Sequence, residues 1–314
     1  MPRRARSLWI PLLVLAMLAW PASTLGFAAG IAAAPPALTP ANPPSGTEGL
    51  GATWYTVPTP EGRTLLVAIY DTRPSPDQAV PAIVVLHGTH GFAREYVQIA
   101  HDLSEQTGYV VAAGCWFDGG GQDADTAEIT PIRCPGGPEF AGATQHAWPA
   151  VRALTQTVRQ YAGGTAPLAI FGHDRGAEVA LQLASTPDPT DAGIQAVVAN
   201  SGIYTALPRT PDYDTPTPLS LADSLAAPVL ILHGQADTEA RFSNAALYYQ
   251  QLQSANKPAQ CVVYPRMGHD AMLRTTPGDA QDHVFTDSVR RSAAFFKGLF
   301  SEGAGQQILD CIPG

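Results

Sequence analysis

The chain has 314 residues, of which 45% are hydrophobic and 14% are charged, and its formal net charge is −9. This composition predicts a folded chain with a sizeable core and argues against disorder. The chain has 18 basic residues, and those outside the N-terminus form no patch. We therefore expect no nucleic-acid partner, because phosphate binding needs clustered Lys and Arg.

The N-terminus is typical of a secretory signal. Arg3, Arg4 and Arg6 precede an apolar run over residues 8–20, and small residues follow as far as Ala34. A membrane span needs about 20 apolar residues, so an uncleaved anchor is the weaker alternative. We expect residues 1–34 to be a signal peptide and the mature protein to be secreted or extracytoplasmic, without stable membrane insertion.

Residues 35–49 are rich in proline, which removes backbone donors and fixes φ. We therefore expect them to form a linker without regular structure. Residues 50–314 should then form one catalytic or binding domain.

The chain has four cysteines. An even number in an exported chain favours disulfides over a metal site. We predict the pairs Cys115–Cys134 and Cys261–Cys311, with free buried thiols as the alternative. No other feature indicates a metal or a cofactor, so we expect neither.

Short apolar runs alternate with helical patterns after residue 50. The runs consist mostly of Val, Ile, Leu and Ala, as in strands that are buried on both faces of a parallel sheet. The predicted strands are 64–70, 82–87, 109–115, 168–172, 194–199, 229–233 and 260–264, and the predicted helices are 96–106, 147–161, 177–184, 245–252 and 289–299. This alternation predicts a doubly wound, mostly parallel α/β sheet with its ligand site at the carboxyl ends of the strands.

The strand over residues 168–172 leads into Gly-His-Asp-Arg-Gly (172–176) and then into a helix. This pattern fits the sharp strand-to-helix turn of a nucleophile elbow, with Asp174 at the position that serine usually occupies. Such a turn exposes the middle side chain above a helix N-terminus, which stabilises negative charge. We predict that Asp174 is the catalytic nucleophile.

Two further motifs follow later strands. Asp237 comes just after the strand 229–233, and His269 lies between the last strand and the last helix. Nucleophile, acid and histidine in this order are typical of α/β-hydrolases. We therefore predict that Asp237 orients His269 and that His269 acts on Asp174, whereas Ser201 lacks flanking glycines and is predicted to be a loop hydroxyl.

The turn after the strand 82–87 supplies a candidate oxyanion hole. Its donors would be the backbone N–H groups of Thr89 and Arg175. The long loop over residues 117–142 is a candidate pocket wall. The predicted pocket-lining side chains are His90, Trp116, Phe117 and His146.

Four stretches of the chain resemble the dienelactone hydrolase branch of the α/β-hydrolase superfamily. They are Val84-Val-Leu-His-Gly, Phe171-Gly-His-Asp-Arg-Gly-Ala-Glu-Val-Ala-Leu, Val229-Leu-Ile-Leu-His-Gly-Gln-Ala-Asp and Val263-Tyr-Pro-Arg-Met-Gly-His. With the segments between them they cover about residues 50–300. The resemblance implies an α/β-hydrolase fold without a large cap domain, and hydrolysis of esters or lactones by a Cys or Ser nucleophile.

Asp174 departs from that family and is similar to the nucleophile of haloalkane dehalogenases, fluoroacetate dehalogenases and epoxide hydrolases. Two features depart from these in turn. Glu178 stands where fluoroacetate dehalogenase has an arginine for its acid substrate. Only about 28 residues separate Ala199 from Pro228, too few for a helical cap.

Three functions are open from the sequence. The first is hydrolysis of small ester- or lactone-like substrates, as the family resemblance implies. The second is attack of Asp174 on an alkyl halide or an epoxide, because a carboxylate that attacks an sp³ carbon gives an ester that water can cleave. The third is ligand binding without turnover, by a protein that we expect to be a monomer.

Overall fold

The computed structural model describes residues 37–117, 129–134, 144–186, 193–206, 216–273 and 282–300. The predicted signal peptide, most of the predicted pocket-wall loop and Cys311 lie outside these residues.

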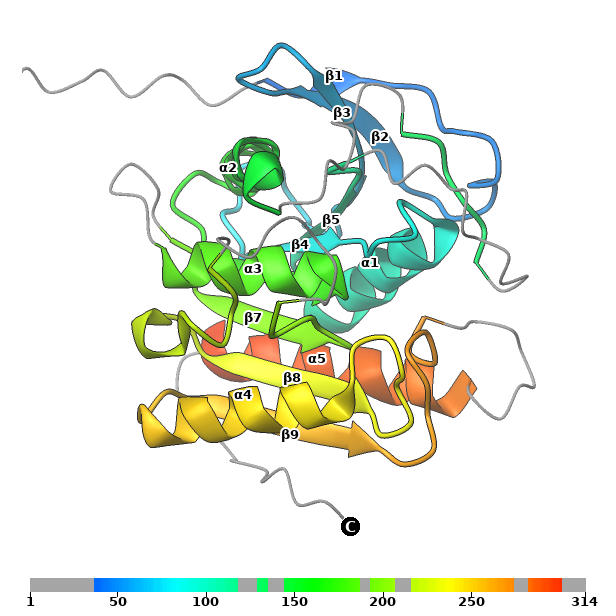
Figure 1. Ribbon diagram of the computed structural model, residues 1–314. Helices are drawn as coiled ribbons and strands as arrows, with labels where there is room; N and C mark the ends of the chain where they lie inside the picture. Colours follow the sequence, from blue (N-terminus) through cyan, green and yellow to red (C-terminus); the bar gives the residue numbers. More distant parts are fainter. Residues whose placement is uncertain are drawn as a thin grey trace, which may run out of the picture. The chain divides into compact units, whose positions relative to one another are not determined.

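Nine strands in the described residues form one sheet, in the order β1-β2-β3-β5-β4-β6-β7-β8-β9 (Figure 1). The strands from β5 to β9 in this order are parallel, and β1 to β3 add an antiparallel edge. The strands are β1 (Thr39–Pro40), β2 (Thr53–Pro58), β3 (Thr64–Tyr70), β4 (Ala82–Leu86), β5 (Val110–Gly114), β6 (Leu168–His173), β7 (Ala196–Asn200), β8 (Val229–Gly234) and β9 (Ala259–Tyr264). The strand order reverses direction at β4 and β6, where such sheets bind ligands.

Helices cover both faces of the sheet (Figure 1). One face packs on α1 (Arg94–Thr107) and α5 (Asp282–Phe300), and the other on α2 (Trp148–Tyr161), α3 (Arg175–Ser185) and α4 (Phe242–Ser254). Successive residues of a strand point to opposite faces, so Val84 and Leu86 join one core and Ile83 and Val85 the other. The predicted doubly wound architecture is confirmed. None of the described helices is long and apolar enough to span a membrane.

All predicted strands and helices are present, most of them longer by one to several residues. Two strands were not predicted. β2 mixes polar and apolar residues and pairs with β3, and β1 lies inside the segment predicted to lack regular structure. That prediction was wrong for Thr39 and Pro40, because an edge strand tolerates proline, which has no N–H to donate to a neighbour.

The predicted disulfide between Cys115 and Cys134 is confirmed. It joins the end of β5 to residues 129–134, a segment in which the Ile132 N–H also donates to the Phe92 carbonyl, just before α1, at 2.8 Å. Cys261 is also disulfide-bonded. Its predicted partner, Cys311, lies outside the described residues.

Candidate active site

Asp174 stands at the turn between β6 and α3, with φ 52° and ψ −115°. A non-glycine residue with this positive φ is strained, and such strain persists where the surrounding structure holds it. The Asp174 N–H donates to the Asn200 carbonyl at 3.0 Å, which ties the turn to the end of β7. The predicted elbow is therefore formed, and it aims the carboxylate out of the carboxyl edge of the sheet.

The two glycines of the elbow make this turn possible. A Cβ on Gly172 would lie 2.4 Å from the Gly176 carbonyl oxygen, and a Cβ on Gly176 would lie 2.4 Å from the Leu86 carbonyl oxygen. Both distances are to backbone atoms, which cannot move aside as a side chain can. Only glycine therefore allows α3 to pack this closely on β4 and β6.

This packing gives a test with a matched control. Gly176 and Gly298 both lie in helices, where alanine is favoured over glycine by roughly 1 kcal/mol. Because a Cβ on Gly298 meets nothing within 4 Å, Gly298→Ala should stabilise the fold. Gly176→Ala should instead lower the free energy of unfolding by about 2 kcal/mol or more, as measured by chemical denaturation. A stabilising effect at both positions would show that the elbow has room for a side chain.

Asp237 and His269 form the acid–histidine pair that the sequence predicts. Asp237 Oδ2 accepts a hydrogen bond from His269 Nδ1 at 2.8 Å. Its Oδ1 accepts the N–H groups of Glu239 and Ala240, each at 2.9 Å. His233 Nε2 donates to the Ala240 carbonyl at 2.6 Å and lies 3.3 Å from Asp237 Oδ2. The acid is thus fixed on both oxygens, and His269 Nε2 is left facing Asp174.

The carboxylate of Asp174 is held by Thr89. Asp174 Oδ2 accepts the Thr89 N–H at 2.7 Å and the Thr89 hydroxyl at 2.5 Å. Asp174 Oδ1 lies 3.6 Å from His269 Nε2, beyond hydrogen-bond distance. One carboxylate oxygen therefore occupies the predicted oxyanion-hole donor, and the other faces His269. The N–H of Arg175 as a second donor remains a prediction.

The charges at the site are set by these contacts. Burial lowers the pKa of His269, but the hydrogen bond to Asp237 and the charge of Asp174 outweigh burial and raise this pKa to about 9. Burial raises the pKa of Asp174, but the charge of His269 and the hydrogen bonds from Thr89 hold it below its usual value. At neutral pH the site thus holds an imidazolium between two carboxylates, and His269 is no base until one of these charges is lost.

The raised pKa of His269 predicts how stability depends on pH. Folded His269 keeps a proton up to about pH 9, whereas unfolded histidine loses it near 6.5. Its contribution, about 3 kcal/mol at most, is therefore complete below pH 6.5 and lost as the pH rises through 9. The unfolding free energy of the parent minus that of His269→Gln should fall over this range. A flat difference would contradict the raised pKa.

The remaining predicted site residues have different positions. Trp116 and Phe117 are fully buried around His87, and Trp116 Nε1 donates to the His87 carbonyl at 3.0 Å. They support the loop that carries Thr89, and pocket lining by them stays a prediction. His146 is exposed in η1 (Thr144–Ala147), and none of its described contacts is with the triad.

The described residues contain two groups of possible metal ligands. In one of them, His87 with Cys115 and Cys134, the two sulfurs are joined in the disulfide. The other group lies beside the triad. It comprises His90, His173 and Asp270, with ligand atoms within 4.8 Å of one another. The Tyr96 hydroxyl accepts the Gly88 N–H and lies 2.6 Å from His90 Nε2 and 3.0 Å from His173 Nδ1. A hydroxyl has one proton and two lone pairs, so it accepts from one imidazole and donates to the other. Only one neutral histidine then keeps a lone pair on its other nitrogen, which disfavours a metal bound by both.

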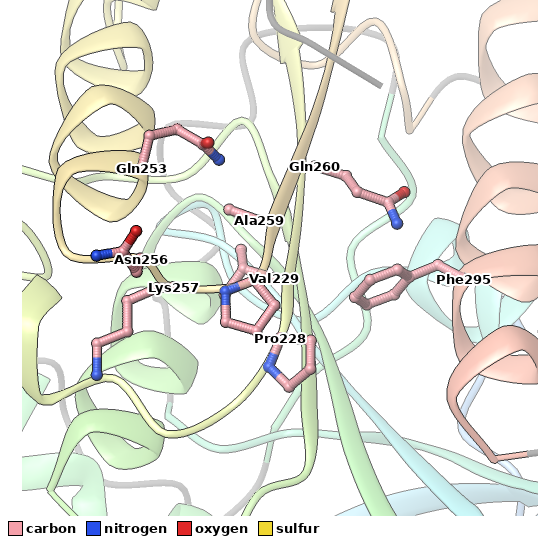
Figure 2. A pocket seen from close by; sticks show the side chains of 9 residues that line it. Pro228, Val229, Gln253, Asn256, Lys257, Ala259, Gln260 and Phe295 are labelled. Atoms are coloured by element: carbon pink, nitrogen blue, oxygen red, sulfur yellow. The ribbon is translucent and has the colours of Figure 1, made fainter. Parts of the chain in front are cut away.

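A pocket of about 290 Å³ lies elsewhere, at the start of β8 and β9 (Figure 2). It is lined by Pro228, Val229, Gln253, Asn256, Lys257, Pro258, Ala259, Gln260 and Phe295. The triad lies at the opposite, carboxyl ends of the same strands. Among these lining residues, all within the described part of the chain, Lys257 alone is charged and no acid–base pair occurs. The triad therefore remains the candidate active site.

The strand order, with a nucleophile position, an acid and a histidine after β6, β8 and β9, defines an α/β-hydrolase. Residues 69–300 match the sequence model of the dienelactone hydrolase family, and the chain belongs to that family. A comparison with curated proteins found no match.

Solved structures show the same fold at low sequence identity. A protein from Klebsiella pneumoniae assigned as a dienelactone hydrolase has 18% identity and a TM-score of 0.60, covering 80% of this chain and 98% of its own. An esterase from Pyrococcus furiosus has 16% identity and a TM-score of 0.59, covering 85% and 99%. An esterase from Thermogutta terrifontis with bound propionate has 15% identity and a TM-score of 0.58, covering 78% and 93%.

Three residues near the triad were not predicted from the sequence. They are His173, which precedes Asp174, Asp270, which follows His269, and Tyr96 of α1. Two of them are direct neighbours of predicted residues in the motifs Gly-His-Asp and Gly-His-Asp-Ala. That adjacency was the available signal, whereas the place of Tyr96 depends on how α1 packs.

Proposed function

We propose that the protein is an exported hydrolase of small molecules in which Asp174 is a covalent nucleophile. Its substrate would carry a leaving group on an sp³ carbon, as an alkyl halide or an epoxide does. The observation that carries this proposal is the position of the Asp174 carboxylate. Its Oδ2 accepts the two hydrogen bonds from Thr89, and its Oδ1 faces His269. A serine would leave the Thr89 N–H for a substrate carbonyl, but here the nucleophile itself takes that donor.

In the first step a lone pair of Asp174 Oδ1 forms a bond to the substrate carbon. With an alkyl halide the carbon–halogen bond breaks and the halide departs with its electron pair. With an epoxide the C–O bond breaks, and the ring oxygen stays on the substrate and takes a proton from water. The lowered pKa of Asp174 keeps the carboxylate ionised for this attack. Alkylation removes the negative charge of Asp174, so the pKa of His269 falls, its Nε2 proton passes to solvent, and Nε2 becomes a base.

In the second step His269 Nε2 takes a proton from water, and the hydroxide attacks Asp174 Cγ. The electron pair of the C=O bond moves onto Oδ2, which Thr89 already contacts. Collapse expels the alkoxide, which takes the proton from His269. Asp174 is then a carboxylic acid with one oxygen from water, and it gives its proton to His269 Nε2, which restores the carboxylate and the imidazolium. Asp237 holds the imidazole in place throughout.

The origin of the oxygen tests this mechanism. We expect a single turnover of 1-bromobutane or styrene oxide in H₂¹⁸O to place ¹⁸O in the peptide that contains Asp174, and not in the product. Mass spectrometry of the peptide and the product reads both. Label in the first-turnover product alone would mean that water attacks the substrate directly, and the proposal would fail.

Ester or lactone hydrolysis is the second candidate, and the family membership favours it. Two of the similar structures are described as esterases. Carboxylate attack on a carbonyl gives a mixed anhydride, so this candidate needs Asp174 to act as a base on water. Hydrolysis of 4-nitrophenyl acetate by the parent protein, with ¹⁸O only in the acetate, would support it over the first.

Export is proposed from the predicted signal peptide. The confirmed disulfide fits an oxidising compartment. N-terminal sequencing of the secreted protein from an expressing host should find the new N-terminus within or just after residues 1–34.

The Thr89 hydroxyl gives a further test of the second step. Thr89→Val keeps the backbone N–H and the side-chain shape but removes the hydroxyl that contacts Oδ2. We expect hydrolysis of the alkyl–enzyme ester to slow by roughly 10²-fold, as for loss of one oxyanion donor, with Thr89→Ser close to the parent. Rapid-quench mass spectrometry should then show the intermediate accumulating in Thr89→Val. Equal rates of ester hydrolysis in all three proteins would assign the hydroxyl no catalytic role.

A further inference from the structure

The acids around the catalytic histidine outnumber the cations. His269 lies between the carboxylates of Asp174 and Asp237, and Asp270 follows it directly in the chain. Burial together with these three aspartates raises the pKa of Glu239, although His269 opposes them. The site therefore carries net negative charge before any substrate arrives.

The described cations nearby do not offset this charge. Arg175, next to the nucleophile, donates through Nη1 to Glu178 Oε2 at 2.6 Å, and both side chains are buried. Burial lowers the pKa of His87 to about 3 and that of His173 well below its usual value, so both are neutral at pH 7. Among the described residues no lysine or arginine forms an ion pair with Asp174, Asp237 or Asp270.

Asp270 has an oxygen without a partner. Its Oδ1 is buried and accepts no hydrogen bond from the described residues, and His173 Nε2, also buried and without a hydrogen bond, lies 3.7 Å away. The Asp270 side chain is 18% exposed, so a ligand can reach the carboxylate, and a carboxylate that lacks a donor favours a ligand that supplies one. A substrate N–H, O–H or ammonium group would meet this need, and a carboxylate would not.

We propose that this site selects neutral or cationic substrates that carry a hydrogen-bond donor, that it rejects carboxylates, and that Asp270 is the residue that determines this preference. The inference takes the reaction from the proposed function, whereas the charge of the site follows from the contacts described above. The buried Arg175–Glu178 pair supports it, since the guanidinium next to the nucleophile already has a carboxylate partner.

Bromoacetamide and bromoacetate test the proposal, because they have nearly the same shape and differ in charge and in their N–H donors. We expect kcat/KM for bromide release to favour bromoacetamide by about a hundredfold, because a site carboxylate within a few ångströms repels the carboxylate of bromoacetate. Asp270→Asn should reduce that preference at least tenfold. Asp223→Asn removes a carboxylate in η2 (Ala222–Ser224), before β8, and should leave the preference unchanged.

Different outcomes would contradict the charge preference and the proposed reaction. Bromide release from both probes at equal rates, or a preference that Asp270→Asn does not alter, overturns the inference and leaves the reaction intact. No release above the Asp174→Asn background counts against the reaction. The preference is then measured with 4-nitrophenyl glutaramate and mono(4-nitrophenyl) glutarate, and absence of a preference for the neutral ester overturns the inference there too.

Discussion

Asp174→Asn should abolish turnover of alkyl halides and epoxides, with kcat lowered by roughly 10⁴-fold or more, as for loss of a covalent nucleophile. Asparagine has the same shape and can still accept the Thr89 N–H, so the elbow should stay folded. Its amide oxygen is a poor nucleophile, and the substitution removes one of the charges that, after the hydrogen bond to Asp237, raise the pKa of His269. Halide release and diol formation measure the loss, and the remote variant Asp223→Asn should keep parental rates.

Asp174→Ser separates the two candidate reactions. It removes the carboxylate from Thr89, which frees the N–H for the carbonyl of an ester. If the pocket is built for acyl transfer, this variant should hydrolyse short-chain 4-nitrophenyl esters at least roughly tenfold faster than the parent. If it stays inert while the parent releases halide, Asp174 is the working nucleophile. Esterase activity gained by the variant, with no halide or epoxide turnover by the parent, would contradict the first proposal.

The central part of the fold could be predicted because each strand there is buried on both faces. β4 and residues 168–172 of β6 are continuous apolar runs, and such runs between helical segments are typical of central strands in a parallel sheet. β2 could not be predicted in the same way, because it mixes exposed and buried residues at the antiparallel edge. β1 is only two residues long and depends on β2 to form at all.

The triad could be predicted because its three members follow strand ends, and parallel strands bring those ends to one edge of the sheet. The sequence does not determine where the Asp174 carboxylate points. Its contact with Thr89 depends on the strained φ of the elbow and on the close approach of the loop after β4. The sequence likewise placed Trp116 and Phe117 near the site, but their burial around His87 depends on how β5 and that loop pack.

His269→Gln should stop the reaction after the first step. Alkylation of Asp174 needs no base, so the variant should still form one alkyl–enzyme ester per site. Hydrolysis of that ester needs a proton acceptor for water, so kcat should fall by roughly 10²–10⁴-fold. Intact-mass spectrometry should show a stoichiometric adduct that peptide mapping places on Asp174. The glutamine amide can still donate a hydrogen bond to Asp237, in place of the one that His269 Nδ1 donates in the parent.

His283→Gln makes the same substitution at an exposed histidine in α5, and this variant should turn over normally without an adduct. The step at which the reaction stops then identifies the mechanism. An adduct in His269→Gln means that this histidine acts after the covalent bond has formed. This agrees with an imidazolium that becomes a base only when alkylation has removed the charge of Asp174. Loss of activity without any adduct would mean that His269 is needed before or during attack on the substrate, and Asp174 would then act as a base and not as a nucleophile.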